Sequence, residues 1–256
     1  MSLPNTPLSR LSVVIITLNA AGQLRACLES ARFADEIVVV DSGSTDATQS
    51  LAAAFGARVQ QQAWLGFGAQ KNFAVGLAAN DWVLCLDADE RVSPALQASI
   101  EQAVEQPRFA AYRFARCNRF LGRYLRHGEG YPDWSLRLFD RRHARWSDDV
   151  VHEKVLTNCP VGTLAGDLLH DSAETLEGYL IKQNRYTSLA AAAAVAAGKR
   201  VTAGALCLSP VVRFLKFYLV RRGFLDGLPG LVHILIGCFN SFCKYAKMIE
   251  LLRARH

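Results

Sequence analysis

Carboxylates stand where two apolar runs of the chain end. The run EIVVV stops at Asp41, and the run WVLCL stops at Asp87, which opens the cluster DADE at residues 87–90. Two carboxylates spaced as Asp-x-Asp reach one divalent cation, and carboxylates with water and phosphate oxygens are the usual ligands of Mg²⁺ and Mn²⁺. Carboxylates this crowded repel one another unless a cation or Arg91 relieves them. We therefore predict a metal site at residues 87–90 rather than a solvated loop, whereas Asp41 by itself fits a residue that caps its turn.

The pattern of apolar residues predicts the elements that position these acids. Continuous runs rich in Val and Ile are typical of buried parallel strands, and leucines four residues apart are typical of helices. We expect strands at residues 11–17, 36–40, 57–60 and 82–86, and helices at 21–32, 48–55 (capped by Ser44), 70–79 and from Ser93 onward. This alternation predicts an α/β fold with a mostly parallel, doubly wound sheet. Ligands bind beyond the carboxyl ends of such strands, which is where the acids lie.

Composition limits the class of protein. The 256 residues suit one large domain, or a domain with an appendage, and 51% hydrophobic with 20% charged residues excludes a disordered or collagen-like chain. The seven cysteines are scattered and form no CxxC pair, so we predict neither a disulfide framework nor a zinc site and favour a reducing compartment. The polar start of the chain predicts no signal peptide.

Positive charge is concentrated in the C-terminal tail. The whole chain carries a formal charge of +6, and residues 199–256 alone hold ten Lys or Arg against Asp226 and Glu250. The tail is also rich in Leu, Phe, Val and Ile, which favours an anionic membrane surface over nucleic acid. No apolar stretch reaches the roughly 18–20 residues of a spanning helix, and the alanine-rich run at 188–198 fits a packed helix better. We therefore expect the tail to lie on a membrane, with a helical lid or an oligomer interface as the alternatives.

Three segments in register carry a family resemblance. The segments VVIITLNA, IVVVDSGSTDAT and QKNFAVGLAANDWVLCLDADE resemble the inverting glycosyltransferases of family 2, which have the GT-A fold. Downstream, the segments NRFLGRYLRHGEGYPDWSLRLFDRR, DDVVHEKV and FLKFYLVRRGFLDGLPGLVHI resemble the bacterial lipopolysaccharide inner-core transferases of that family, whose typical member is a beta-1,4-glucosyltransferase acting on a core heptose. The similarity covers nearly the whole chain.

The resemblance implies a domain division and a donor site. It implies a Rossmann-like GT-A catalytic domain at residues 1–198, with a nucleotide-sugar half at 1–105 and an acceptor and catalytic half at 106–198, followed by an amphipathic helical tail at 199–256 that associates with the membrane. Residues that would contact the nucleotide-sugar are Thr17, Asn19, Asp41, Lys71, Asn72, Asp87, Arg137, Arg185 and Tyr186. Asp41 would receive the uracil or ribose.

The resemblance also implies a base and a metal site. Many family members carry Glu-Asp at the position of the base, where this chain reads His152-Glu153. Glu153 is our candidate for the base that deprotonates the acceptor hydroxyl, with Asp133 in reserve and His152 in a supporting role. Asp89 would hold Mg²⁺ or Mn²⁺ on the diphosphate, and His170 is a candidate third ligand that fits a buried structural histidine equally well.

Two further sets of basic residues are candidates for acidic or lipid partners. Because a lipopolysaccharide core is anionic, Arg119, Arg123 and Arg126, together with Arg116, are candidates for binding the acceptor, although arginines on an ordinary amphipathic segment look the same. Residues predicted to face the membrane are Arg213, Lys216, Arg221 and Arg222.

These expectations combine into one function. We expect a metal-dependent, inverting hexosyltransferase that moves glucose from UDP-glucose to a lipid-linked lipopolysaccharide core sugar, in the cytoplasm at the inner face of the bacterial inner membrane. Nucleic acid is not an expected partner. The alternatives are transfer to a polyprenyl phosphate or another cell-envelope glycan, and a non-catalytic membrane-binding protein on a nucleotide-binding fold. A sugar nucleotidyltransferase would carry a glycine-rich phosphate loop after the first strand, and TLNAAGQL is not one.

Overall fold

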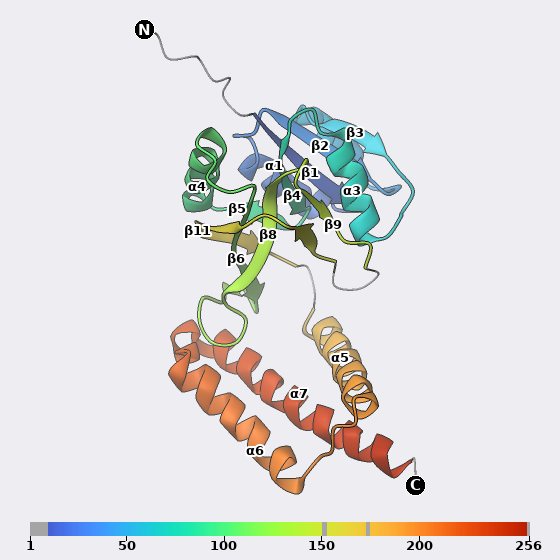
Figure 1. The fold of residues 1–256 in the computed structure, drawn as a ribbon, viewed down its shortest axis with the longest axis vertical. Coiled ribbons are helices and arrows are strands. Elements are labelled where there is room, and N and C mark those ends of the chain that lie inside the picture. The colour runs from blue at the N-terminus through green and yellow to red at the C-terminus, as the bar shows by residue number, and fades with distance from the viewer. Residues whose placement is uncertain (1–9, 150–152, 173–174, 255–256) are drawn as a thin grey trace. The chain divides into compact units, whose positions relative to one another are not determined.

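The chain divides into two compact units. The computed structural model describes residues 10–149, 153–172 and 175–254. The sheet unit comprises Met1–Arg116 and Asp133–Asp171, and the helical unit comprises Cys117–Pro132 and Ser172–His256 (Figure 1). This division differs from the boundary at residue 199 that the sequence suggested, because the helix that follows residue 175 packs against the last helix of the chain.

The first half of the sheet is parallel. It consists of β1 (Leu11–Thr17), β2 (Glu36–Asp41), β3 (Arg58–Gln61) and β4 (Trp82–Asp87), in the order β3-β2-β1-β4. The helices α1 (Ala21–Ser30), α2 (Thr48–Ala54) and α3 (Phe67–Leu77) connect these strands in turn. The α/β class and the GT-A type of sheet are therefore confirmed. Thr17 pairs with Asp41 and Ile16 pairs with Asp87, so both strand-end acids flank the end of β1.

One predicted helix cap is wrong. Helix α2 begins at Thr48, and Ala47 is the residue before it, so Ser44 does not cap this helix. The Ser44 hydroxyl instead donates to Asp41 within the turn. In contrast, Ser93 does cap the next helix, α4 (Pro94–Glu105), by accepting a hydrogen bond from the Leu96 amide.

The second half of the sheet is antiparallel. Strand β4 pairs with β8 (Asp133–Asp140), and the order continues through β6 (Ala111–Phe120), β11 (Val161–His170) and β5 (Glu90–Val92). The short β7 (Arg123–Tyr124) pairs with β6, and β9 (Ala144–Trp146) pairs with β10 (Val155–Thr157) in a separate ribbon. The register of β11 on β5 sets His170 opposite Glu90.

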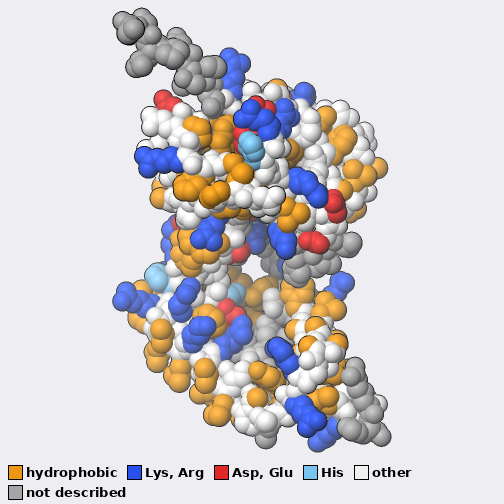
Figure 2. Space-filling view, in the orientation of Figure 1, with side chains coloured by type: hydrophobic (Ala, Val, Ile, Leu, Met, Phe, Trp, Pro, Cys, Tyr) orange, Lys and Arg blue, Asp and Glu red, His pale blue; other side chains and the backbone are white. Residues whose placement is uncertain are grey.

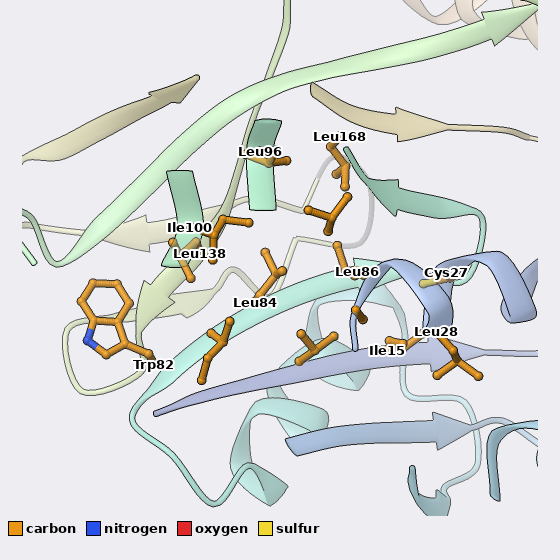
Figure 3. Close-up of a cluster of buried hydrophobic side chains, with 14 of the residues drawn as sticks. Ile15, Cys27, Leu28, Trp82, Leu84, Leu86, Leu96, Ile100, Leu138 and Leu168 are labelled. Atoms are coloured by element: carbon orange, nitrogen blue, oxygen red, sulfur yellow. The ribbon is translucent and has the colours of Figure 1, made fainter. Parts of the chain in front are cut away.

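Two hydrophobic clusters cover the two faces of the sheet. One contains Ile15, Leu84 and Leu86 with residues of α1 and α4, and Figure 3 shows its side chains lying between the strands and these helices. The other contains Val14, Val83 and α3. Neighbouring strand residues therefore point into opposite cores, which explains why β1 and β4 read as continuous apolar runs.

The helical unit is built on three long helices. These are α5 (Leu176–Ala196), α6 (Ala203–Phe214) and α7 (Gly227–Arg253), with a π-helical turn at Leu215–Val220 and a 3-10 turn at Gly223–Asp226. Both α5 and α6 pack against α7. The alanine-rich run is a packed helix, as predicted, because Ala191 and Ala194 are buried against Met248.

One helix of this unit is long and apolar enough to cross a membrane. It runs through Gly223–Arg253, with a mean hydropathy of 1.3 in its most apolar window. The expectation that no segment reaches this length was based on uninterrupted apolar residues, whereas the helix continues through Pro229, His233 and Asn240. Length and composition alone do not separate a span from the core helix of a folded domain.

Candidate active site

A buried lysine links the two central carboxylates of the site. Lys71 lies one turn into α3, and its side chain is 3% exposed. Its Nζ is 3.2 Å from Asp87 Oδ1 and 3.0 Å from Glu153 Oε1. The proposed base and the last residue of β4 are thus joined through one cation, although they are far apart in the sequence.

Arginines extend this arrangement along β8 and β6. Arg137 Nη2 is 3.0 Å from Asp87 Oδ2 and 3.2 Å from Glu90 Oε1. Arg116 lies 3.6 Å from Glu90 and 2.7 Å from Asp133. We call the group Lys71, Asp87, Glu90, Arg116, Asp133, Arg137 and Glu153 the ion-pair network. Within the described residues, the one buried side-chain nitrogen or oxygen that has no hydrogen-bond partner is Arg137 Nη1, which leaves a donor for a ligand oxygen.

The network divides its carboxylates into two electrostatic states. Burial opposes ionisation of Asp87, but the charges of Arg137 and Lys71 outweigh it and hold the pKa of Asp87 well below its usual value. Burial dominates at Glu90, and with the nearby charge of Asp87 it raises the pKa of Glu90 above the usual value. Burial opposes the charge of Arg137, but the two carboxylates outweigh burial and raise the pKa of Arg137 above its usual value.

Trp146 supports both cations of the network. Its ring centre lies 4.5 Å from Lys71 Nζ and 5.2 Å from Arg137 Cζ, distances at which a cation is attracted to an aromatic face. The Asn72 amide donates to the Trp146 carbonyl at 3.0 Å and accepts from its N–H at 2.9 Å. Asn72 therefore holds Trp146 in place in this structure, and its predicted contact with the nucleotide-sugar stays a prediction.

Asp89 and His170, the two residues predicted to hold a metal, lie close together. Asp89 Oδ2 is 3.3 Å from His170 Nε2, because β11 runs beside β5. Among the described residues, no three His, Cys, Asp or Glu side chains are grouped to hold an ion. Mg²⁺ keeps several waters and takes one or two carboxylates plus substrate phosphates. This donor pair therefore fits a cation completed by a diphosphate better than one enclosed by protein.

Asp41 forms a closed turn. Its Oδ1 accepts hydrogen bonds from the Gly43 and Ser44 amides and from Gln49, and its Oδ2 accepts from the Thr17 and Ser44 hydroxyls. The side chain is fully buried. Burial opposes its ionisation, but these hydrogen bonds outweigh burial and lower the pKa of Asp41. The geometry matches the turn-capping alternative, and direct contacts of Asp41 and Thr17 with a nucleotide stay predictions.

Asn19 completes this turn. It adopts a left-handed conformation with φ of 49°, its amide donates to the Ser44 hydroxyl, and its side chain accepts from the Thr45 amide. The loop after β1 is thereby fixed to the turn after β2. Leu18 is left exposed between them.

The remaining predicted residues lie in the helical unit. Arg123 donates to the Leu225 carbonyl, Arg213 pairs with Glu129, and Arg221 donates to the Tyr131 carbonyl. The others in this unit are Arg119, Arg126, Arg185, Tyr186, Lys216 and Arg222. Their predicted contacts with diphosphate, acceptor or membrane stay predictions, and His152 lies outside the described residues.

Three members of this site were not identified from the sequence. Glu90 was counted as one more acid in a cluster, Arg116 as an acceptor arginine, and Trp146 was not singled out. Glu90 and Arg116 are joined through β5 and β6, which are not sequence neighbours. The only available signal for Trp146 was a tryptophan close to the segment DDVVHEKV.

The carboxyl edge of the sheet thus presents a carboxylate held by a buried lysine, a buried arginine and a carboxylate–imidazole pair. This set can accept a proton, neutralise an anionic leaving group and bind a divalent cation. A family model described as Glycosyl transferase family 2 matches residues 12–161. The chain belongs to this family and is a glycosyltransferase.

Relatives of known name cover almost the whole chain. It is 32% identical over 256 residues to the lipopolysaccharide core biosynthesis glycosyltransferase LpsC of Rhizobium meliloti, covering 97% of this chain and 94% of LpsC. It is also 32% identical over 263 residues to the uncharacterized glycosyltransferase RT0209 of Rickettsia typhi, covering 97% of this chain and 90% of that protein.

Solved structures show weaker similarity. Staphylococcus aureus TarS matches 91% of this chain and 49% of its own, with a TM-score of 0.49 and 14% identity. Mycobacterium tuberculosis glucosyl-3-phosphoglycerate synthase, in a complex with Mn²⁺ and UDP, matches 43% of this chain and 44% of its own, with a TM-score of 0.37 and 24% identity.

Proposed function

We propose that the chain is an inverting hexosyltransferase that transfers glucose from UDP-glucose to a sugar of the lipopolysaccharide inner core. The observation that carries the proposal is the Glu153–Lys71–Asp87 linkage at the carboxyl edge of the sheet. The similarity to LpsC over most of both chains supports the class of acceptor.

In the proposed reaction, Glu153 takes the proton of the acceptor hydroxyl. The acceptor oxygen attacks the anomeric carbon from the face opposite the diphosphate, the bond to the diphosphate oxygen breaks, and the electron pair leaves with UDP. General base catalysis of this kind contributes about 10²–10⁴-fold to a rate. Lys71 holds Glu153 through one oxygen, Oε1, and so fixes the direction of the carboxylate.

Charge on the departing diphosphate is neutralised at the same edge. Arg137 contributes the Nη1 donor, which has no partner among the described residues, and its charge is kept by Asp87 and Glu90. Asp89 and His170 are the residues that would hold Mg²⁺ or Mn²⁺. When bound, the cation supplies Lewis-acid stabilisation of the diphosphate.

The experiment that tests this function is calorimetric titration of UDP and UDP-glucose, with and without Mn²⁺. The proteins compared are the wild type and Asp89→Ala, with Asp148→Ala as the control, since Asp148 is an exposed acid in the same unit. We expect metal-dependent UDP binding that is lost only in Asp89→Ala. A folded wild type that binds no nucleotide would refute the proposal.

We further propose that the helical unit docks on an anionic membrane from the cytoplasmic side, where a lipid-linked acceptor is reached. Support comes from exposed apolar side chains along α6 and the turn after it, namely Leu208, Val211, Val212, Leu215, Leu219 and Val220. Figure 2 shows hydrophobic side chains gathered along the outer edge of this unit. Lys216, Arg221 and Arg222 interleave with them, and each basic residue near anionic lipid contributes about 1 kcal/mol.

Sedimentation with phosphatidylglycerol vesicles tests the membrane proposal. We expect Val220→Glu to weaken vesicle binding, whereas Ile181→Glu, another well exposed apolar site, on α5, serves as the control. Arg213 is less suited to lipid contact than the sequence suggested, because it pairs with Glu129. Equal losses in both variants would speak against a defined membrane face.

A further inference from the structure

An exposed apolar loop lies at the edge of the active site and has no role in the proposed chemistry. It connects β3 to α3 and carries Trp64 and Leu65, and Phe67 follows as the first residue of α3; their exposed fractions are 50%, 51% and 52%. Figure 1 shows it as an open connection from the tip of β3 to the start of α3. Contiguous exposed apolar side chains of this size often mark a binding site.

The loop is held in a defined shape. Gln70 is fully buried, and its amide accepts from the Leu65 N–H at 3.3 Å while donating to the Gln62 carbonyl and the Ser42 hydroxyl at 3.2 Å each. The Trp64 and Phe67 rings pack edge to face, with centres 4.8 Å apart. The hydrogen bonds of the buried Gln70 therefore fix the loop that carries the aromatic rings.

The loop leads directly to the proposed base. The Phe67 ring centre is 5.9 Å from Lys71 Nζ, and that nitrogen is 3.0 Å from Glu153 Oε1, so ring and carboxylate lie within the span of a disaccharide. A methyl group on Gly68 would collide with the Ser147 carbonyl and lie 3.7 Å from Glu153 Cβ. The start of α3 is thus packed against the segment that carries the base.

The chemistry of the loop fits a sugar better than a lipid surface. Residues 59–70 contain no charged side chain, so they offer no charge to anionic lipid, whereas Gln60, Gln61 and Gln62 supply amides just before the rings in the chain. The face of an aromatic ring carries partial negative charge and attracts the polarised C–H groups on the face of a pyranose. Aromatic rings with a few amides are a common composition for small-molecule sites.

We propose that Trp64, Leu65 and Phe67 form a platform for a pyranose ring of the acceptor glycan, next to the hydroxyl that Glu153 deprotonates. The proposal rests on the proposed function and adds the residues that recognise the acceptor.

The test is calorimetric titration of a deacylated lipopolysaccharide core oligosaccharide into UDP-saturated protein. The proteins compared are the wild type, Trp64→Ala, Trp64→Phe and the control Phe109→Ala. Phe109 is an aromatic residue that is 40% exposed. Its neighbour Ala110 accepts a hydrogen bond from the Asp140 amide, and Asp140 pairs with Trp82 at the start of β4. Phe109 therefore lies at the opposite edge of the sheet from the site. UDP affinity and vesicle binding are measured on the same proteins.

We expect Trp64→Ala to weaken oligosaccharide binding about 5- to 20-fold, Trp64→Phe less, and Phe109→Ala not at all. UDP affinity and vesicle binding stay unchanged. Weaker UDP binding in Trp64→Ala would reassign the loop to the nucleobase, and weaker vesicle binding would reassign it to the membrane; either overturns the platform. A wild type that binds UDP without the oligosaccharide also overturns it and leaves the transferase standing, whereas a wild type that binds neither refutes the proposed function.

Discussion

Two strand-end acids of the sheet unit look alike in the sequence and differ in the structure. Asp41 ends β2 and is satisfied by amides and hydroxyls of its own turn, with all bonds made within nine residues except the one from Thr17 on the neighbouring strand. Asp87 ends β4 and is satisfied by Lys71 and Arg137, two side chains from other elements. Asp41 is fully buried, whereas Asp87 is partly exposed.

The difference in hydrogen-bond partners suggests different uses for the two carboxylates. A carboxylate bonded by backbone amides cannot release its partners without unfolding the turn. A carboxylate bonded by Lys and Arg side chains shares mobile charges that a diphosphate or an acceptor can also attract. In the proposed reaction we therefore assign the mobile charges to the Asp87 end, on the type of partner rather than on the acid itself.

The largest expected effect concerns Glu153, which Lys71 links to Asp87. Glu153→Gln keeps the shape of the side chain and removes the base, so we expect kcat to fall by about 10²–10⁴-fold with UDP affinity unchanged. Steady-state transfer assays measure the fall, and Asp148→Asn is the control. Retained activity in Glu153→Gln together with loss in Asp133→Asn would move the base to Asp133.

The next largest effect concerns stability and the turn that Asp41 holds. Asp41→Ala leaves several buried donors in the turn without an acceptor, and we expect a loss of about 3 kcal/mol in the free energy of unfolding. Denaturant titration measures it, and Asp46→Ala is the comparison, because Asp46 is an exposed acid in the same turn. Equal losses in the two variants would mean that the buried hydrogen bonds of Asp41 stabilise the fold no more than the exposed ones of Asp46.

The pH dependence of the unfolding free energy tests whether the charge of Asp41 stabilises the turn. The pKa of Asp41 is lowered in the folded state, so its stabilisation is present above the unfolded pKa of about 4 and is lost as pH falls through the folded pKa. The gap in unfolding free energy between wild type and Asp41→Asn therefore shrinks as pH falls below about 4. A constant gap would show that the charge of Asp41 is not what the turn stabilises.

The smallest expected effect concerns the ring beneath the cations. Trp146→Leu removes cation–π contacts with Lys71 and Arg137, which are each worth about 1 kcal/mol, while Trp146→Phe keeps a weaker version. We expect KM for UDP-glucose to rise several-fold in Trp146→Leu and less in Trp146→Phe. Identical kinetics in the two variants, at equal thermal stability, would mean that the ring only fills space.

The parallel strands were predictable because each is buried on both faces and reads as an uninterrupted apolar run, as in β1 and β4. The acids at their ends followed from the same pattern. The pairing of Lys71 with Glu153 was not predictable, because it joins residues 82 positions apart, one in α3 and one in the segment before β10. The hydrogen bonds of Ser44 with Asp41 and of Asn72 with Trp146 were not predicted for a related reason, since short polar side chains take whichever partner the tertiary structure brings near.

The boundary of the helical unit shows another limit. Residues 117–132 and α5 join the C-terminal helices through contacts such as His127 with Asp226 and Asn240 with Gln183. No change in composition marks residue 172, so the charge of the tail suggested a later boundary.

The small core of the helical unit affects how often that unit opens. Its buried cluster consists of Ala191, Ala194, Val195 and Met248, whereas the sheet unit is built on two much larger clusters. Regions with few buried apolar contacts open at lower free energy than the rest of a protein. Amide protons of α5 and α6 should therefore exchange with solvent sooner than those of β1 and β4. The part of the chain that we propose meets the lipid would rearrange repeatedly while the catalytic edge keeps its geometry.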